Sequence, residues 1–182
     1  MSKASDFVNY LLSLMHSDDK KALATLKRLR ETPYVPGHYK PGATRLLWRF
    51  TEGDPEASAF QKDMRFLVAL AFAWYPHRGV HYGNFGTTYR AVMKDLKSGP
   101  SVEARFDKIL SEKFTASLFH YVFSFVSLAR AREVPINWFR LLEDLENWHD
   151  PMRSVQRAWQ KEAFVFTPKP KNDNEIAAEA AV

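Results

Sequence analysis

The sequence predicts an all-α protein of about eight or nine helices in two small packed bundles. Apolar residues in the long segments recur with the 3.6-residue period of a helix, and few stretches alternate with period two. Cap residues, prolines and glycines separate one periodic segment from the next. Hydrophobic residues make up 46% of the 182 residues and aromatic residues 14%, which is enough for a packed core.

The first 97 residues are expected to form the N-terminal, basic bundle. Cap residues predict the first two helix starts, at Ser5-Asp6 and at Ser17-Asp18-Asp19. Asp54-Pro55 is a cap followed by a proline at the first helical position. Prolines and glycines predict loops at 32–42 and 77–86. We therefore expect helices at about 5–15, 20–30, 43–50, 54–75 and 87–97.

The clearest break in the chain is Ser98-Gly99-Pro100-Ser101, which predicts a boundary between domains 1–97 and 98–166. In the C-terminal bundle, Asp150-Pro151 repeats the cap-plus-proline start. Residues 167–182 contain two prolines followed by NDNEIAAEAAV, and we expect a mobile tail. The helices of the second bundle are expected at about 102–112, 114–131, 136–147 and 152–163.

Several classes of protein are disfavoured by composition. The absence of cysteine excludes a disulfide framework, a thiolate zinc site and a cysteine nucleophile, and it fits a reducing cytoplasm. The two most apolar runs, Phe66–Tyr75 and Phe114–Ala129, are shorter than the roughly 20 residues of a membrane span. The first ten residues hold no apolar run that resembles a signal peptide. We expect a cytoplasmic protein without a membrane partner.

Positive charge is concentrated in the first half of the chain. The net charge is +5; residues 1–97 carry 15 basic and 9 acidic side chains, whereas residues 98–166 carry 9 of each. A localised basic field attracts polyanions by steering and by counterion release. The sequence therefore points to a polyanionic partner for the N-terminal part.

The stretch KKALATLKRLR, residues 20–30, has five basic residues and no acidic one. On a helix its apolar side chains form one stripe, and its basic side chains gather on the opposite side. The stripe consists of Ala22, Leu23, Leu26 and Leu29, and the basic side of Lys20, Lys21, Lys27 and Arg28. The pattern suits a solvated helix face and a polyanion-binding face equally well, and both interpretations stay open.

Motifs for catalysis or metal binding are weak. His77 and His81 have an HxxxH spacing, but Gly79 and the flanking residues favour a surface loop. The pair His149-Asp150 is better explained by a helix cap, and GNFG at 83–86 by a turn that opens a helix. Signatures of phosphate-binding loops, serine hydrolases and zinc proteases are absent from the sequence. We predict no catalytic residue, no metal site and no cofactor.

A paired-tryptophan segment near the end carries a family resemblance. Residues 136–148, INWFRLLEDLENW, are followed by VQRAWQKEAF at 155–164. Trp138, Leu141, Leu142, Leu145 and Trp148 should form one apolar helix face, covered from the next helix by Val155, Trp159 and Phe164. Three other stretches agree in order: ATLKRLR at 24–30, NFG at 84–86 and ARF at 104–106. Over roughly residues 8–166 the chain resembles the CasB family, the small subunit of the type I-E CRISPR complex Cascade.

The resemblance implies a non-catalytic, all-helical subunit of an RNA-guided antiviral complex. Members of the family sit as two copies end to end beside the other Cascade subunits and the guide RNA. Their basic surfaces follow the backbones of the target DNA and of the displaced non-target strand, which stabilises the R-loop without reading sequence. Guide RNA supplies the recognition by pairing, and a separate helicase-nuclease cuts the DNA.

The candidate nucleic-acid-binding residues come from the resemblance and from charge. Family position indicates Lys27, Arg28 and Arg105, and charge alone adds Lys20, Lys21 and Arg30. Weaker candidates are Arg45, Lys108, Lys113, Arg153 and Arg157. Two alternatives stay open: a free-standing helical nucleic-acid-binding protein, and a helical adaptor or scaffold for an acidic protein partner.

Overall fold

The structure is a computed structural model that describes residues 3–16, 20–29, 35–80, 82–94 and 100–164. Within these ranges the secondary structure is helical, without a strand, which confirms the predicted all-α class. The elements are α1 (Lys3–His16), α2 (Lys20–Leu29), α3 (Pro41–Leu47), the 3₁₀ helix η1 (Trp48–Phe50), α4 (Ala59–Trp74), α5 (Phe85–Lys94), α6 (Pro100–Ser111), α7 (Thr115–Ala131), α8 (Trp138–Glu146) and α9 (Ser154–Phe164).

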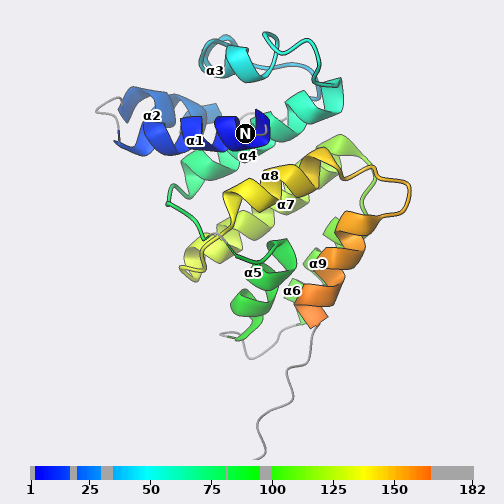
Figure 1. Cartoon of the computed structure of the whole chain (residues 1–182). Helices are drawn as coiled ribbons and strands as arrows, with labels where there is room; N and C mark the ends of the chain where they lie inside the picture. Colours follow the sequence, from blue (N-terminus) through cyan, green and yellow to red (C-terminus); the bar gives the residue numbers. More distant parts are fainter. Residues whose placement is uncertain (1–2, 17–19, 30–34, 81, 95–99, 165–182) are drawn as a thin grey trace, which may run out of the picture.

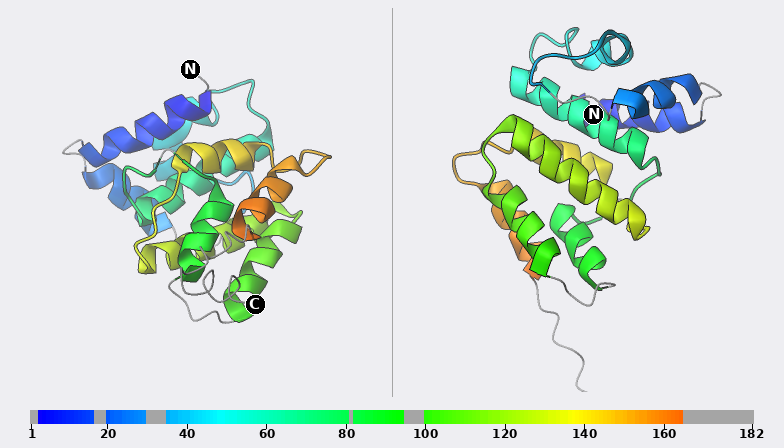
Figure 2. Two further views of the ribbon diagram at one scale, coloured as in Figure 1. Left: turned by 60° about the horizontal axis from the view of Figure 1, so that its bottom comes forward. Right: turned by 180° about the vertical axis from the view of Figure 1, so that it is seen from behind.

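The helices lie in layers along the molecule (Figure 1). Helices α1, α2 and α3 gather around α4 at one end, whereas α5, α6 and α9 form the other end. Helices α7 and α8 lie between them, and both pack against α4, as the view from behind also shows (Figure 2). Helix α5 packs against α7 and α9. The division into domains 1–97 and 98–166 stays a prediction, and the tail 167–182 lies outside the described residues.

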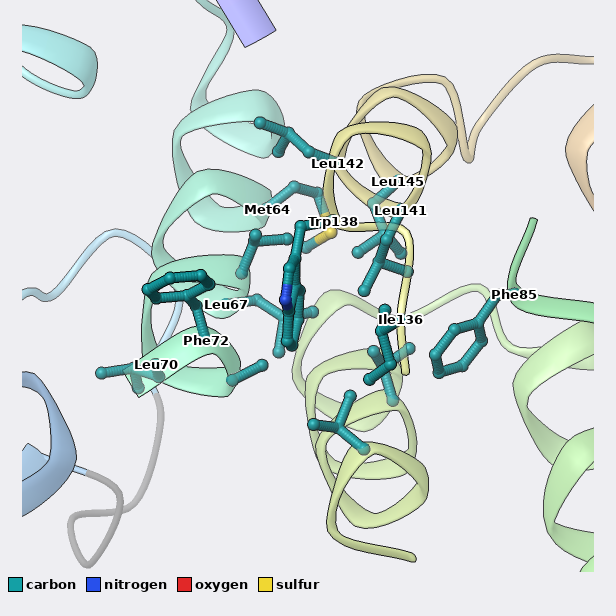
Figure 3. Close-up of a cluster of buried hydrophobic side chains, with 14 of the residues drawn as sticks. Met64, Leu67, Leu70, Phe72, Phe85, Ile136, Trp138, Leu141, Leu142 and Leu145 are labelled. Carbon is teal, nitrogen blue, oxygen red and sulfur yellow. The ribbon is translucent and has the colours of Figure 1, made fainter. Parts of the chain in front are cut away.

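The predicted apolar face of α8 is confirmed, but its covering differs from the prediction. Trp138 and Trp148 are each 1% exposed, and the leucines between them are equally buried. Figure 3 shows Trp138 standing between the side chains of α4 and Ile136. Helix α8 packs on α4 and α1, while Trp159 of α9 contacts it directly, since Trp159 Nε1 donates to Asp144, and its ring lies 5.0 Å from that of Trp148. Phe164 instead lies against Tyr89 and is 39% exposed.

The start predicted at Asp54-Pro55 is wrong, because α4 begins at Ala59. Ser58 and Gln61 form a capping box in which each side chain accepts the other's backbone N–H. Asp54 has a different role as a buried partner of Arg65: Arg65 Nη1 donates to Asp54 Oδ2 at 2.7 Å, and Arg65 Nε donates to Glu146 of α8 at 2.6 Å. Asp54 therefore links the turn before α4 to the buried Arg65 side chain.

The start predicted at Asp150-Pro151 is also wrong, because α9 begins at Ser154. The Asp150 carboxylate accepts hydrogen bonds from the backbone N–H groups of Met152 and Ser154, which stabilises a turn. Arg153 has φ +52°, a left-handed conformation that interrupts any helix running from Pro151. The first start also shifts, since Ser5 and Asp6 lie inside α1, which begins at Lys3. The caps expected at residues 17–19 fall outside the described residues.

Helix α5 begins two residues earlier than predicted, and its start explains the NFG stretch. Asn84 Oδ1 accepts from the N–H groups of Gly86 and Thr87, so Asn84 caps the helix. Asn84 Nδ2 donates to the carbonyl of Ala158 in α9. A Cβ on Gly86 would lie 2.0 Å from the carbonyl oxygen of Trp159. Glycine is therefore required here because the backbones of α5 and α9 approach too closely for any side chain.

Candidate nucleic-acid interface

Helix α2 separates its apolar and basic side chains as the sequence predicts. Ala22 is 3% exposed and Leu26 is fully buried, since α2 packs on α1, α3 and α4. Lys21, Lys27 and Arg28 are exposed on the helix. Lys20 belongs to α2, but its side chain is outside the described part, and Arg30 lies beyond it. Part of the predicted basic face is thus open to a partner.

The ring of Trp74, the last residue of α4, contacts basic side chains from both α2 and α7. Lys27 Nζ lies 5.5 Å from the centroid of the Trp74 ring, and Arg130 Cζ of α7 lies 4.1 Å from it. Such cation–π contacts hold long basic side chains over an aromatic face. Arg132, directly after α7, is exposed. We call the set Lys21, Lys27, Arg28, Arg130 and Arg132 the α2–α7 basic surface; α2 and the end of α7 lie on the same side of the molecule, with the end of α4 between them (Figure 1).

Sequence reasoning missed Arg130 and Arg132. Arg130 lies at the end of an apolar run that predicts only a buried helix, and it is 100 positions from the KKALATLKRLR stretch. The sequence does show the alternation ARAR at 129–132, but the relation of these arginines to the basic residues of α2 depends on the packing of α7 against α4. Trp74 likewise lies near the end of an apolar run, Phe66–Tyr75, whose composition indicates only a buried helix. Burial and Glu133 raise the pKa of its neighbour Tyr75, while Arg130 acts against that shift.

The remaining candidates lie elsewhere, on α6, α9 and the corner between α6 and α7. Arg105 and Lys108 are exposed on α6, where Lys108 Nζ lies 5.8 Å from the ring of Tyr121. Lys113 is exposed at the corner before α7. Arg157 is exposed on α9 and donates to the carbonyl of Met152. The predicted residues therefore form two separate groups, and Arg45 is exposed on α3 near the first.

His77 and His149 pack against aromatic rings. His77 stacks near Tyr75 and Trp138, and burial lowers its pKa to about 4, so it is neutral near pH 7. Its Nδ1 accepts from the N–H of Gly79 at 2.8 Å. His149 stacks on Phe60, with ring centroids 4.1 Å apart. Among the described residues no group of three or more His, Cys, Asp or Glu is placed to hold a metal ion, and His81 is outside them.

No described helix has both the length and the apolar composition needed to cross a bilayer.

Comparison with known proteins places the chain in a family. Residues 22–163 match the family model described as CRISPR-associated protein Cse2. The chain belongs to the Cse2 family. This confirms the resemblance to CasB, because solved members are described under both names. A search of curated proteins gives no match.

Solved structures show the same fold over nearly the whole chain. A Cse2-family protein from Thermus thermophilus is 25% identical, with a TM-score of 0.77 over 90% of this chain and 99% of that one. CasB from M. ruber is 21% identical, with a TM-score of 0.72 over 100% and 98%. A chain of a CRISPR RNA-guided surveillance complex is 20% identical, with a TM-score of 0.71 over 99% and 98%. A Cse2-family fold is thus found within a surveillance complex.

Proposed function

We propose that this Cse2-family protein is the non-catalytic small subunit of a type I-E CRISPR surveillance complex, Cascade. It binds nucleic-acid backbone without reading sequence and stabilises target DNA and the displaced strand in the R-loop during antiviral defence. Its partners are the other Cascade subunits, the guide RNA and a second copy of itself, in the cytoplasm. The family match and the fold shared with a chain of a surveillance complex support the general role.

The observation that supports the nucleic-acid role is that two basic side chains from different helices contact the ring of Trp74. Lys27 and Arg130 come from helices far apart in sequence, and one ring positions both. A helix face that is only solvated does not require basic residues from a neighbouring helix. A surface that binds the backbone of a nucleic-acid strand, in contrast, must extend over more than one helix. Opening a duplex against a guide RNA is a nearly balanced exchange, so modest backbone contacts are enough to favour it.

The first test is reconstitution with Lys27→Glu/Arg28→Glu. If four to six cations each neutralise a phosphate, binding of a single strand weakens with salt at a log–log slope of about −3 to −4. The double variant should assemble normally but bind matched DNA more weakly, with the slope reduced by about 1.4 for a single strand and about 1.8 for a duplex. Affinity is measured by filter binding or anisotropy across a salt series.

The matched control is Lys94→Glu/Lys161→Glu, which changes net charge equally at exposed positions outside the α2–α7 basic surface. It should leave affinity and slope nearly unchanged. Equal loss in both variants would contradict a specific surface. A wild-type protein that fails to join the complex, yet binds nucleic acid alone, would favour the free-standing alternative. Indifference to nucleic acid altogether would favour the adaptor for an acidic partner.

A further inference from the structure

A groove of about 570 Å³ lies between the end of α6 and the start of α9. Leu110 forms part of one wall, and Met152, Arg153 and Arg157 form part of the other. A smaller hollow of about 250 Å³ shares Arg153 and extends toward Lys113. We call the two together the α6–α9 groove. It is separate from the α2–α7 basic surface, on helices of the opposite end of the molecule (Figure 2).

Gln156 lines both parts of the groove and carries an unsatisfied acceptor. The residue is 7% exposed, and its Nε2 donates to the carbonyl of Trp148 at 2.7 Å. Its Oε1 is buried without a hydrogen-bond partner in the described part of the chain. A buried acceptor left in this state is destabilising, because it has lost its hydrogen bonds to water without gaining a partner. A ligand that brings an N–H donor to this oxygen removes that destabilisation.

Two arginines in the groove are already held in position. Arg153 Nη2 donates to the carbonyl of Leu110 at 2.6 Å, and Arg157 Nη2 donates to the carbonyl of Met152. Each guanidinium has five N–H donors and uses one in these bonds, so most donors stay available. A fixed, planar guanidinium can stack on a flat ring or bind a phosphate in two-point fashion.

The composition of the groove indicates what it accommodates. The residues that line the larger part mix apolar surface from Leu110, Pro151 and Met152 with polar and charged groups, among them Asp107, Gln156 and the two arginines. A nucleobase needs flat faces to stack on and polar groups at its edge, as single-stranded bases receive in proteins. Guanidinium, amide and methionine side chains supply both.

We infer that the α6–α9 groove receives an unstacked nucleobase of a single-stranded nucleic acid. Gln156 accepts a hydrogen bond from an N–H of the base edge, and Arg153 and Arg157 stack on the ring or bind the adjoining phosphate. The inference rests on the proposed function, since the backbone contacts elsewhere bring the strand to the protein. It adds a base-contacting site to a protein whose other proposed contacts are with the phosphate backbone.

The test compares two oligonucleotides with equal numbers of phosphates, a 12-mer of thymidine and a 12-mer of abasic sites, by fluorescence anisotropy at fixed salt. The full chain should bind the thymidine strand about tenfold more tightly, because a stacked base contributes roughly 1–3 kcal/mol. Gln156→Leu should reduce this preference. Lys27→Glu/Arg28→Glu should weaken both strands by the same factor.

A second experiment uses the unaltered protein, so it does not depend on the folding of a variant. A strand that contains 5-iododeoxyuridine is photo-crosslinked, and the modified peptide is identified by mass spectrometry. Crosslinks in residues 107–113 or 148–160, which line the groove, support the inference, and crosslinks confined to other segments overturn it.

The outcomes separate the two proposals. Equal affinity for thymidine and abasic strands overturns the base site and leaves the backbone role intact. Failure to bind either strand overturns the backbone role, and the base site with it. If Gln156→Leu keeps the wild-type preference but no longer assembles with the other subunits, the groove holds a protein side chain and the inference is wrong.

Discussion

At the scale of single residues, Arg65 is a buried cation that pairs with two acidic side chains. Its side chain is 4% exposed and lies between two carboxylates, Asp54 and Glu146, while its Nη1 also donates to the carbonyl of Phe50 at 2.9 Å. Arg65 and Lys3 lower the pKa of Asp54 to about 2. The stability contributed by this ionised aspartate is present above its unfolded pKa of about 4, and it is lost as pH falls from there toward 2.

Replacing Arg65 should therefore destabilise the fold strongly. Arg65→Ala removes the cation that Glu146 contacts and leaves the buried Asp54 with Lys3 alone, and we expect a loss of about 3–5 kcal/mol in the free energy of unfolding. Urea denaturation measures it. Lys62→Ala on the same helix is the control, because Lys62 makes only a 3.9 Å contact with Glu52; its loss should be about 0–1 kcal/mol. Similar losses in both variants would show that the buried network adds nothing.

Asp144 titrates in the opposite sense. It is 2% exposed, and burial raises its pKa to about 6, although Trp159 Nε1 donates to it at 2.5 Å and Arg140 Nε lies 2.9 Å away. The folded protein thus binds this proton more tightly than the unfolded chain. The stability gained from protonation is complete below about pH 4 and is lost as pH rises through about 6.

Asp144→Asn should remove this dependence while keeping an oxygen for Trp159 Nε1. Relative to the wild type, the free energy of unfolding of the variant should increase by about 2–3 kcal/mol between pH 4 and pH 7. Guanidinium titrations at several pH values measure it. Glu143→Gln, at an exposed position on the same helix, serves as control and should show no comparable shift. A pH-independent difference for Asp144→Asn would contradict a raised pKa.

At the scale of elements, the contact between α5 and α9 depends on Gly86. Gly86→Ala adds a Cβ that would lie 2.0 Å from the backbone oxygen of Trp159, so the helices must separate. We expect a loss of about 1–3 kcal/mol in unfolding free energy and altered near-ultraviolet dichroism from Trp159. This cost should outweigh the gain of about 1 kcal/mol that alanine brings to a helix.

Gly42→Ala in α3 is the matched control for that variant. A Cβ there meets only the methyl group of Thr25, at 3.1 Å, and a side chain adjusts more readily than a backbone. The substitution should be neutral within about 1 kcal/mol. If both glycine variants behave alike, close backbone approach is not the reason for Gly86.

At the scale of the whole molecule, the sequence predicted the helices better than their starts. Long periodic segments such as those of α4 and α7 signal burial directly, and both are helices. The helix starts predicted at Asp54 and Asp150 are wrong because an aspartate before a proline can equally well stabilise a turn or join a buried ion pair. Only its tertiary partners decide between these roles. The partner of Asp54 is Arg65, eleven positions away and on another element.

The candidate interface was predictable only in part for the same reason. Local sequence shows the charge separation on α2, and the structure confirms that Lys27 and Arg28 are exposed. The addition of Arg130 depends on the packing of α7 against α4, which local sequence does not specify. The unsatisfied oxygen of Gln156 is likewise a property of packing, since the residue type alone suggests a solvated helix position.

The indole of Trp74 has a practical consequence. It lies beside Lys27 and Arg130, whereas Trp138, Trp148 and Trp159 are buried in the interior; the fifth tryptophan, Trp48, is exposed, and Trp48→Phe removes its emission. The emission of an indole responds to charges next to its ring, so phosphates that draw the two cations away would change the fluorescence of Trp74 and leave that of the interior tryptophans constant. The protein therefore contains its own optical reporter of strand engagement, and no dye needs to be attached to follow it.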